Sequence, residues 1–136
     1  MSLLPPRTYT VEEATAALAD VRPLVERIVA AYANLPELQE AARVADYKRS
    51  RPSAGPAEQH AYEAAQRVMQ HAEMEFAEDA LRLERLGVVL KDPGIGLIDF
   101  YGYRDGVLVE LCWKLGEPAV EHWHRIGDGF PGRQPI

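Results

Sequence analysis

The sequence predicts an α+β fold, in which a long antiparallel helical hairpin with a short intervening helix packs on a small antiparallel β-sheet that is followed by an ordered C-terminal tail. The composition of the chain changes sharply near residue 87. Residues 10–86 are rich in Ala, Glu, Leu, Arg and Gln, whereas residues 87–136 hold nine of the ten glycines and both tryptophans. The first set of residues favours helices, and the second favours turns and strands. We therefore expect a helical part over 10–86 and a β-hairpin or meander with a tail over 87–136.

Length and charge bound the class of protein. A chain of 136 residues matches one domain, so residues 1–136 are expected to form a single unit. Hydrophobic residues make up 47% and charged residues 26%, a balance typical of globular proteins. The formal net charge of −6 disfavours nucleic acid and anionic membrane surfaces as partners, because both are bound by basic surfaces.

The expected compartment follows from the cysteine count and the hydropathy pattern. The single cysteine cannot form an internal disulfide, which fits a reducing compartment. The opening MSLLPPRTYT has no apolar signal segment, and no stretch approaches the ~18 apolar residues that a membrane span needs. We expect a cytoplasmic protein.

The first helix is predicted to begin after Thr10, because Thr10 and Glu13 have the spacing of a capping box. Pro23 interrupts the helix, so that it either kinks there or a second helix begins. An apolar stripe follows the cap at alternating four- and three-residue steps, which is typical of a helix packed lengthwise against a partner. Its members are Ala14, Leu18, Val21, Val25, Ile28 and Tyr32.

A short helix is predicted to begin at Pro36 and to end in the polar loop over 48–56. The longest helix follows over about 57–86 and would extend about 45 Å. It has an apolar residue every seven positions, at Tyr62, Met69, Phe76 and Leu83. A helix of this length exceeds the width of such a domain. We expect the two striped helices to form an antiparallel hairpin and a homodimer to form through them.

The β part is predicted to contain a hairpin. Gly87 is expected to cap the long helix, and 88–90 to form a short strand. The β-prone runs 97–103 and 107–113 are joined through Asp105 and Gly106, a dipeptide that favours a two-residue type I′ turn. This turn predicts the cross-strand pairs. Ile98–Trp113, Phe100–Leu111 and Gly102–Val109 are expected on the face toward the helices, with Asp99–Cys112 and Tyr101–Glu110 on the other.

A third strand is predicted over 119–126, with His122 and His124 on one side and Trp123 on the other. Residues two apart on a strand project from the same face, so both imidazoles could bind one metal ion, with zinc or iron as the candidates. The remaining ligands would come from Cys112, Asp99 and Glu117, with other carboxylates of the same half, such as Glu110 and Asp128, as further candidates.

The sequence leaves two possible roles open for each of two other residues, Cys112 and Arg133. Cys112 is expected either to pack as a small apolar side chain or to act as a nucleophile activated by a nearby histidine. Arg133, together with Trp123, is expected either to anchor the tail or to bind an anionic small-molecule ligand.

Several strings in the chain resemble the prokaryotic family catalogued as domain of unknown function 2203. They are RTYTVEEA at 7–14, LKDP at 90–93, GLIDF at 96–100, LCWKLGEP at 111–118, WH at 123–124 and GFPGRQPI at 129–136. The resemblance implies a small bacterial cytoplasmic protein, and it carries no catalytic role to any residue. It includes Asp99, Cys112, Glu117, His124 and Arg133, whereas His122 lies outside the matched strings.

The sequence therefore favours two functions from different classes. The first is an interaction module that self-associates through its helices. The alternative is a transition-metal-binding protein, or a metal-dependent enzyme, that uses His122, His124, Cys112 and a carboxylate. Whether the chain is an enzyme stays open at this point.

Overall fold

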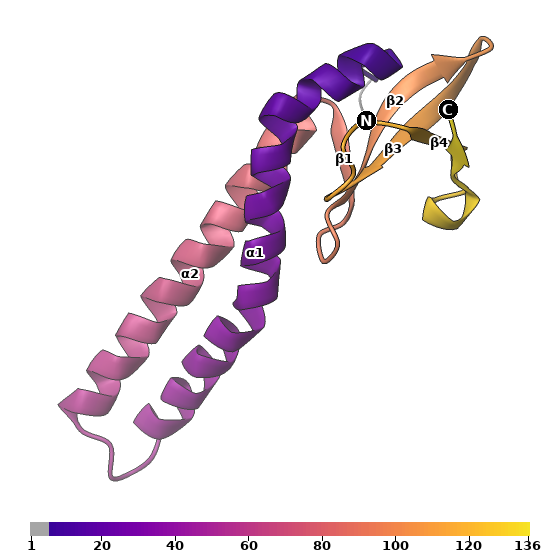
Figure 1. Cartoon of the computed structure of the whole chain (residues 1–136). Coiled ribbons are helices and arrows are strands. Elements are labelled where there is room, and N and C mark those ends of the chain that lie inside the picture. Colours follow the sequence, from indigo (N-terminus) through magenta and orange to yellow (C-terminus); the bar gives the residue numbers. More distant parts are fainter. Residues whose placement is uncertain (1–5) are drawn as a thin grey trace.

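The computed structural model describes residues 6–136 and consists of two long helices and a five-stranded antiparallel sheet. The α+β fold predicted from the sequence is confirmed (Figure 1). Residues 1–5 lie outside the described part. The expectation that the opening residues form no signal segment therefore falls partly on residues that the structure does not describe. Neither described helix is long and apolar enough to cross a membrane.

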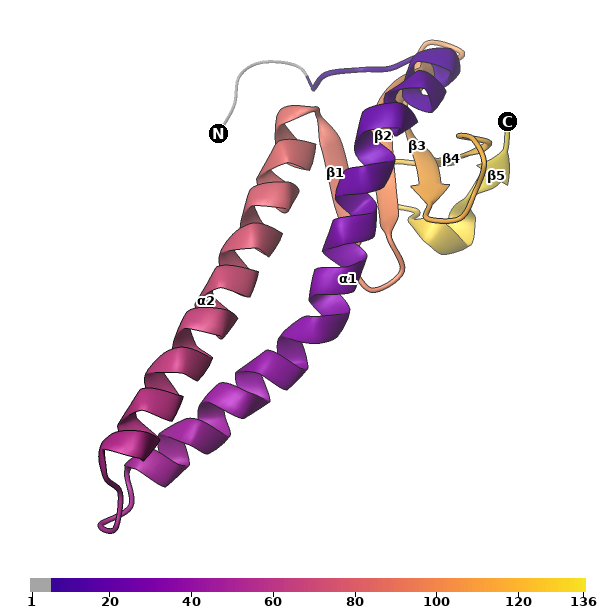
Figure 2. The ribbon, with the colours of Figure 1, turned by 60° about the vertical axis from the view of Figure 1, so that its left-hand side comes forward.

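Helix α1 (Val11–Arg49) runs unbroken through both of its prolines. The prediction of a separate short helix from Pro36 is therefore wrong, and Pro23 does not begin a new helix either. Each proline removes a backbone hydrogen bond and crowds the preceding turn, which bends a helix without necessarily ending it. Figure 2 shows that the axis of α1 changes direction along its length. Helix α2 (Pro56–Arg85) packs along α1 and completes the hairpin.

The predicted capping box at the start of α1 and the predicted glycine after α2 are confirmed. The Thr10 hydroxyl accepts a hydrogen bond from the Glu13 amide at 3.0 Å, and the Thr10 amide donates to Glu13 Oε1 at 2.9 Å. After α2, Gly87 has a φ of +76°, which glycine adopts without the penalty that a side chain would bring.

The sheet contains β1 (Val88–Asp92), β2 (Leu97–Arg104), β3 (Val107–Lys114), β4 (His122–Arg125) and β5 (Gln134–Pro135) in chain order. Asp105 and Gly106 both have positive φ, as a type I′ turn requires. The predicted register of the hairpin is confirmed, with Asp99 opposite Cys112 and Phe100 opposite Leu111. Strand β4 is shorter than the predicted 119–126, and the tail adds β5.

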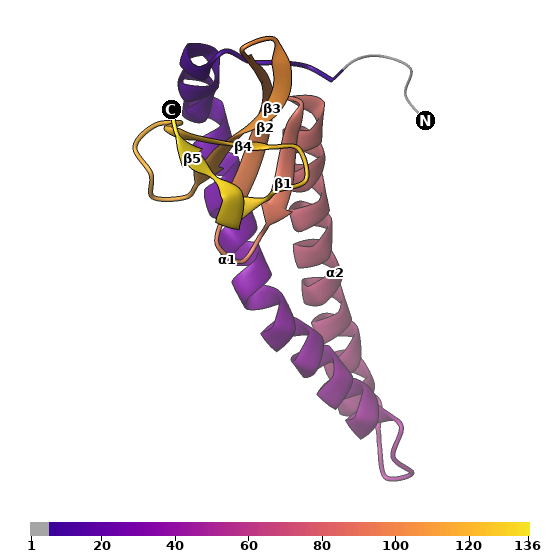
Figure 3. The ribbon, with the colours of Figure 1, turned by 90° about the vertical axis from the view of Figure 1, so that its right-hand side faces the viewer.

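The two faces of the sheet have different surroundings. Ile98, Phe100 and Trp113 lie on the face toward the helices, in one buried cluster with α1 residues such as Val25 and Ile28. On the opposite side, the C-terminal segment lies in front of the sheet (Figure 3). A short 3-10 helix, η1 (Phe130–Gly132), precedes β5 in that segment. The sheet is therefore the middle layer, and its outer face is partly covered by the end of the chain.

Gly96 lies where the start of β2 packs closely against α1, so a side chain there should destabilise the protein. A methyl group on Gly96 would lie 2.7 Å from Leu115 Cβ and 2.9 Å from Val25 Cγ1, and its φ is +69°. Gly116 has a φ of +104°, but no atom of the described chain would lie within 4 Å of its added Cβ. We expect Gly96→Ala to lower the free energy of unfolding by about 3 kcal/mol, and Gly116→Ala by about 1 kcal/mol. Urea denaturation checks both values, and equal losses would contradict the expected clash.

Candidate functional site

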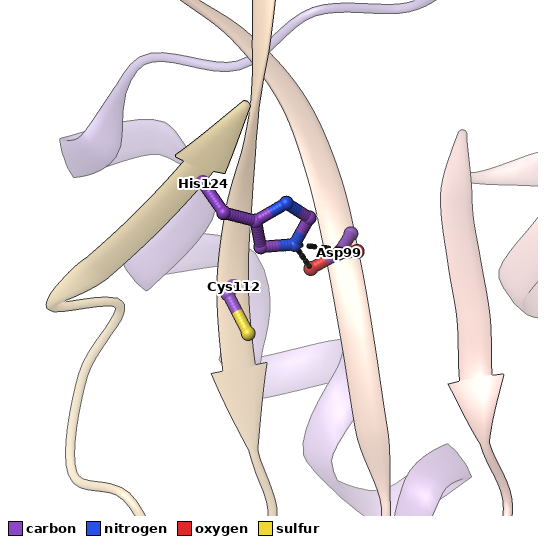
Figure 4. A group of neighbouring side chains, drawn as sticks. All are labelled: Asp99, Cys112 and His124. Carbon is purple, nitrogen blue, oxygen red and sulfur yellow. Dashed lines mark hydrogen bonds and ion pairs between the residues drawn. The ribbon is translucent and has the colours of Figure 1, made fainter. Parts of the chain in front are cut away.

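Three side chains from neighbouring strands converge on the outer face of the sheet. Asp99 comes from β2, Cys112 from β3 and His124 from β4, and Figure 4 shows the His124 ring directed at Asp99 with Cys112 on the strand beside them. Their candidate ligand atoms all lie within 4.8 Å of each other. Each residue is only 1% exposed. The strand pairing predicted from the sequence therefore places a carboxylate, a thiol and an imidazole in one buried cluster.

The imidazole of His124 is held at both nitrogens. Nδ1 lies 2.9 Å from the carbonyl oxygen of Arg125, which can only accept, so Nδ1 carries a proton and donates it. Nε2 lies 3.1 Å from both carboxylate oxygens of Asp99. The ring is therefore fixed in orientation, with Nε2 directed at the carboxylate.

A second buried carboxylate lies beside Asp99. Glu110, on β3, is opposite His124 and has an oxygen, Oε2, that accepts no hydrogen bond from any described residue. The Lys91 ammonium lies 3.2 Å from this oxygen and 3.8 Å from Asp99 Oδ2. Burial acts to lower the pKa of Lys91, but its attraction to Glu110 and Asp99 outweighs this effect and raises the pKa.

Burial also sets the protonation of Asp99 and Cys112. Burial, reinforced by the neighbouring Glu110 carboxyl group, raises the pKa of Asp99 to about 6, although His124 opposes the rise. Burial raises the pKa of the Cys112 thiol to about 11, even though Arg133 acts in the opposite direction. Because both nitrogens of His124 already have partners, the imidazole is not arranged to take the thiol proton. This geometry argues against the nucleophile alternative for Cys112.

Glu117, His122 and Arg133 form a separate group beside this cluster. Arg133 donates from Nη1 to Glu117 Oε1 at 3.0 Å and from Nη2 to Oε2 at 2.6 Å. His122 Nδ1 lies 3.6 Å from Glu117 Oε2. Burial acts to raise the pKa of Glu117, but the hydrogen bonds from Arg133 outweigh it and lower the pKa. Arg133 Nη1 also lies 3.8 Å from Cys112 Sγ, so this group borders the first.

The five predicted metal ligands are thus divided. Asp99, Cys112 and His124 converge, whereas Glu117 and His122 lie in the ion-paired group with Arg133. Because both terminal nitrogens of Arg133 donate to Glu117, its guanidinium holds the tail against the loop after β3. A charged carboxylate already occupies the place that an anionic ligand would take.

The structure does not bring Trp123 to Arg133. Trp123 packs against the core cluster on the side of the sheet toward the helices, and the Arg104 guanidinium lies 4.8 Å from its ring centroid. Arg133 instead lies over the Phe130 ring, at 4.6 Å.

Lys91 was not identified from the sequence. The predicted strand 88–90 ends two residues too early, because β1 extends to Asp92 and pairs Val89 with Asp99. Since alternate residues of a strand share a face, a strand longer by one residue would have placed Lys91 beside Asp99.

The fold and the cluster together define an α+β protein with a buried polar centre between the sheet and its C-terminal segment. The chain belongs to the family described as Uncharacterized conserved protein (DUF2203), whose model matches residues 7–136. The match includes both helices and all the site residues above. No curated protein and no solved structure matches the chain.

The raised pKa of Asp99 predicts a pH-dependent stability. Between the ordinary value of 3.8 and about 6, the folded protein binds more protons at Asp99 than the unfolded chain does. This group therefore lowers the free energy of unfolding as the pH rises through that window, and the effect is complete above it. Asp99→Asn cannot titrate, so its stability relative to the unsubstituted protein should improve from pH 4 to pH 7.

Urea denaturation in EDTA at several pH values measures this difference. Asp105→Asn is the matched control, because Asp105 is exposed and Asn suits the same turn. A difference between Asp99→Asn and the unsubstituted protein that stays constant with pH would contradict the prediction.

Proposed function

We propose that this protein binds a divalent transition-metal ion of the zinc class through Asp99, Cys112 and His124. Thiolate, imidazole and carboxylate are the three side-chain donors that zinc takes in proteins. The thiolate favours such ions over magnesium or calcium, which prefer oxygen donors alone. Binding would release the proton that Cys112 otherwise keeps, so the affinity should increase with pH.

The distances support a shared ion. Three atoms that lie pairwise within 4.8 Å have a common point no more than about 2.8 Å from each, whereas zinc takes its ligands at about 2.0–2.3 Å. Side-chain shifts of less than about 1 Å would bring the three atoms from this separation to zinc–ligand distances. The donors sit on three hydrogen-bonded strands, which limits how far they can move apart.

The observation that carries the proposal is the contact between His124 and Asp99. With Nδ1–H donated to the Arg125 carbonyl, a neutral ring directs the lone pair of Nε2 at a carboxylate 3.1 Å away. Two acceptors at this distance need a cation between them, either a proton or a metal ion. A backbone carbonyl that fixes the other nitrogen is the usual support for a metal-binding histidine.

Burial favours a held ion over a catalytic one. Because each of the three residues is 1% exposed, a substrate could not reach an ion among them without movement of the chain. The bound ion would cross-link β2, β3 and β4 beneath the C-terminal segment. The function we propose is therefore metal-dependent stabilisation of this end of the fold.

Zinc titration of protein purified without an affinity tag tests the proposal. We expect one equivalent of Zn²⁺ to bind and to raise the melting temperature, and Co²⁺ to give the charge-transfer absorption of a thiolate ligand. Asp99→Asn, Cys112→Ser and His124→Gln should each weaken binding about 10-fold or more.

His122→Gln is the matched control, and it should bind as the unsubstituted protein does if His122 is not a ligand. Equal loss in His122→Gln would extend the ligand set to His122. Absence of binding and of any thermal shift in the unsubstituted protein would overturn the proposal.

A second function, self-association through the helical hairpin, is favoured by the weak burial along its outer part. Beyond Ile28, α1 buries only Ala42, and α2 buries no residue before Asp79. Figure 1 shows this part of the hairpin projecting away from the sheet. Tyr47 is 67% exposed and Met74 is 61% exposed. Two helices with so little buried surface gain little stability from packing on each other alone.

A second copy of the chain is the partner that this surface fits. A groove of about 460 Å³ lies between the helices near their connecting loop. Its lining is mostly small and apolar, from Ala41, Val44, Ala45, Lys48, Ala57, Glu58 and Ala61. Two antiparallel hairpins that pack along such grooves form a four-helix bundle, the common way to bury apolar stripes of this kind.

Sedimentation velocity at micromolar concentration tests self-association. We expect a dimer, and we expect Ala61→Glu to shift it toward monomer because a charge would enter the apolar groove. Gln70→Glu makes a similar change in charge at an exposed position of the same helix and should leave the dimer intact. A monomer at these concentrations would remove this second function.

A further inference from the structure

We infer that the Lys91 ammonium holds the place of a metal ion between the Glu110 and Asp99 carboxylates, and that a bound metal displaces it into solvent. This inference rests on the proposed metal site and adds its regulation, because it makes Lys91 an internal competitor for the metal. It also assigns Glu110, which lies outside the group of three converging ligand atoms, as a fourth ligand that would move onto the ion once the ammonium leaves.

The contacts of Lys91 support the exchange. Its Nζ lies 3.2 Å from Glu110 Oε2 and 3.8 Å from Asp99 Oδ2, so it reaches both carboxylates. The Glu110 oxygen that it faces accepts no hydrogen bond from the described residues. Because no other described residue contacts this oxygen as a donor, it becomes available to a metal ion when the ammonium leaves.

The charges of the group favour a further cation. Glu117 is neutralised by two hydrogen bonds from Arg133, so these two charges balance each other. Asp99 and Glu110 are both buried, and among the described residues Lys91 is the one permanent cation paired with them. The remaining negative charge favours a further cation, and a metal ion can supply it.

Lys91 is also free to leave. Its side chain is 39% exposed, whereas that of Arg133 is 17% exposed. Strand β1 is an edge strand of the sheet, and a long flexible lysine can carry its ammonium from such an edge into water. Arg133 could leave only by breaking both of its hydrogen bonds to Glu117. Metal binding would therefore move one positive charge from the carboxylates to the solvent at the sheet edge.

Zinc affinity and thermal stability of Lys91→Met test the exchange. The substitution keeps most of the side-chain volume and removes the competing charge, so Zn²⁺ should bind at least about 10-fold tighter in competition with a chromophoric chelator. In EDTA, the melting temperature of Lys91→Met should fall, because the two carboxylates lose their counter-charge. Saturating Zn²⁺ should then raise it more than in the unsubstituted protein.

Arg67→Met is the charge-matched control, because Arg67 is exposed on α2 and belongs neither to the metal cluster nor to the lining of the helical groove. It should bind Zn²⁺ as the unsubstituted protein does. Glu110→Gln should weaken zinc binding, which separates a fourth ligand from a bystander.

The outcomes distinguish the two proposals. If the unsubstituted protein binds Zn²⁺ and Lys91→Met binds it equally or more weakly, the exchange is wrong and the metal site stands. If neither protein binds Zn²⁺, the metal site is wrong and the exchange fails with it. If Lys91→Met in EDTA is as stable as Arg67→Met, the ammonium does not neutralise the carboxylates, and the exchange is overturned whatever the zinc result.

Discussion

The pairing register of β2 with β3 is the constraint on which the rest of the structure depends. The two-residue turn at Asp105 and Gly106 determines it, because both residues adopt the positive φ values of a type I′ turn. A slip of one residue would exchange the faces of a strand. Asp99 would then lie against the helices, and Phe100 would lie outside the core. The hydrophobic core and the buried polar centre therefore both depend on the register of β2 with β3.

The outer face of the sheet buries two carboxylate side chains. Asp99 and Glu110 are buried next to each other, and burial of a carboxylate is costly unless a cation or hydrogen bonds compensate it. Compensation comes from two directions: Lys91 at the edge strand and His124 on β4. Apolar residues of the same volume are often at least as stable as buried ion pairs. Retention of so many charges in a small fold is why we assign function to this face.

Agreement between the sequence and the structure is closest where the determinants are local. The Thr10–Glu13 capping box, the glycine after α2 and the turn at Asp105 each involve neighbouring residues, and each was predicted correctly. The expected break at Pro36 was wrong, because α1 continues on both sides of the proline. A proline inside a helix costs about 3 kcal/mol, but it can bend the helix without ending it.

By itself, the sequence determined the fold class, the faces of the central hairpin and the presence of Asp99, Cys112 and His124 on one side of the sheet. These features follow from periodicity and from one turn, which act over a few residues. Only the tertiary structure decided which of five candidate ligands converge, that Arg133 neutralises Glu117, and that Lys91 reaches two carboxylates. Those contacts depend on how far β1 extends and on where the tail folds back, and no short-range pattern specifies either one.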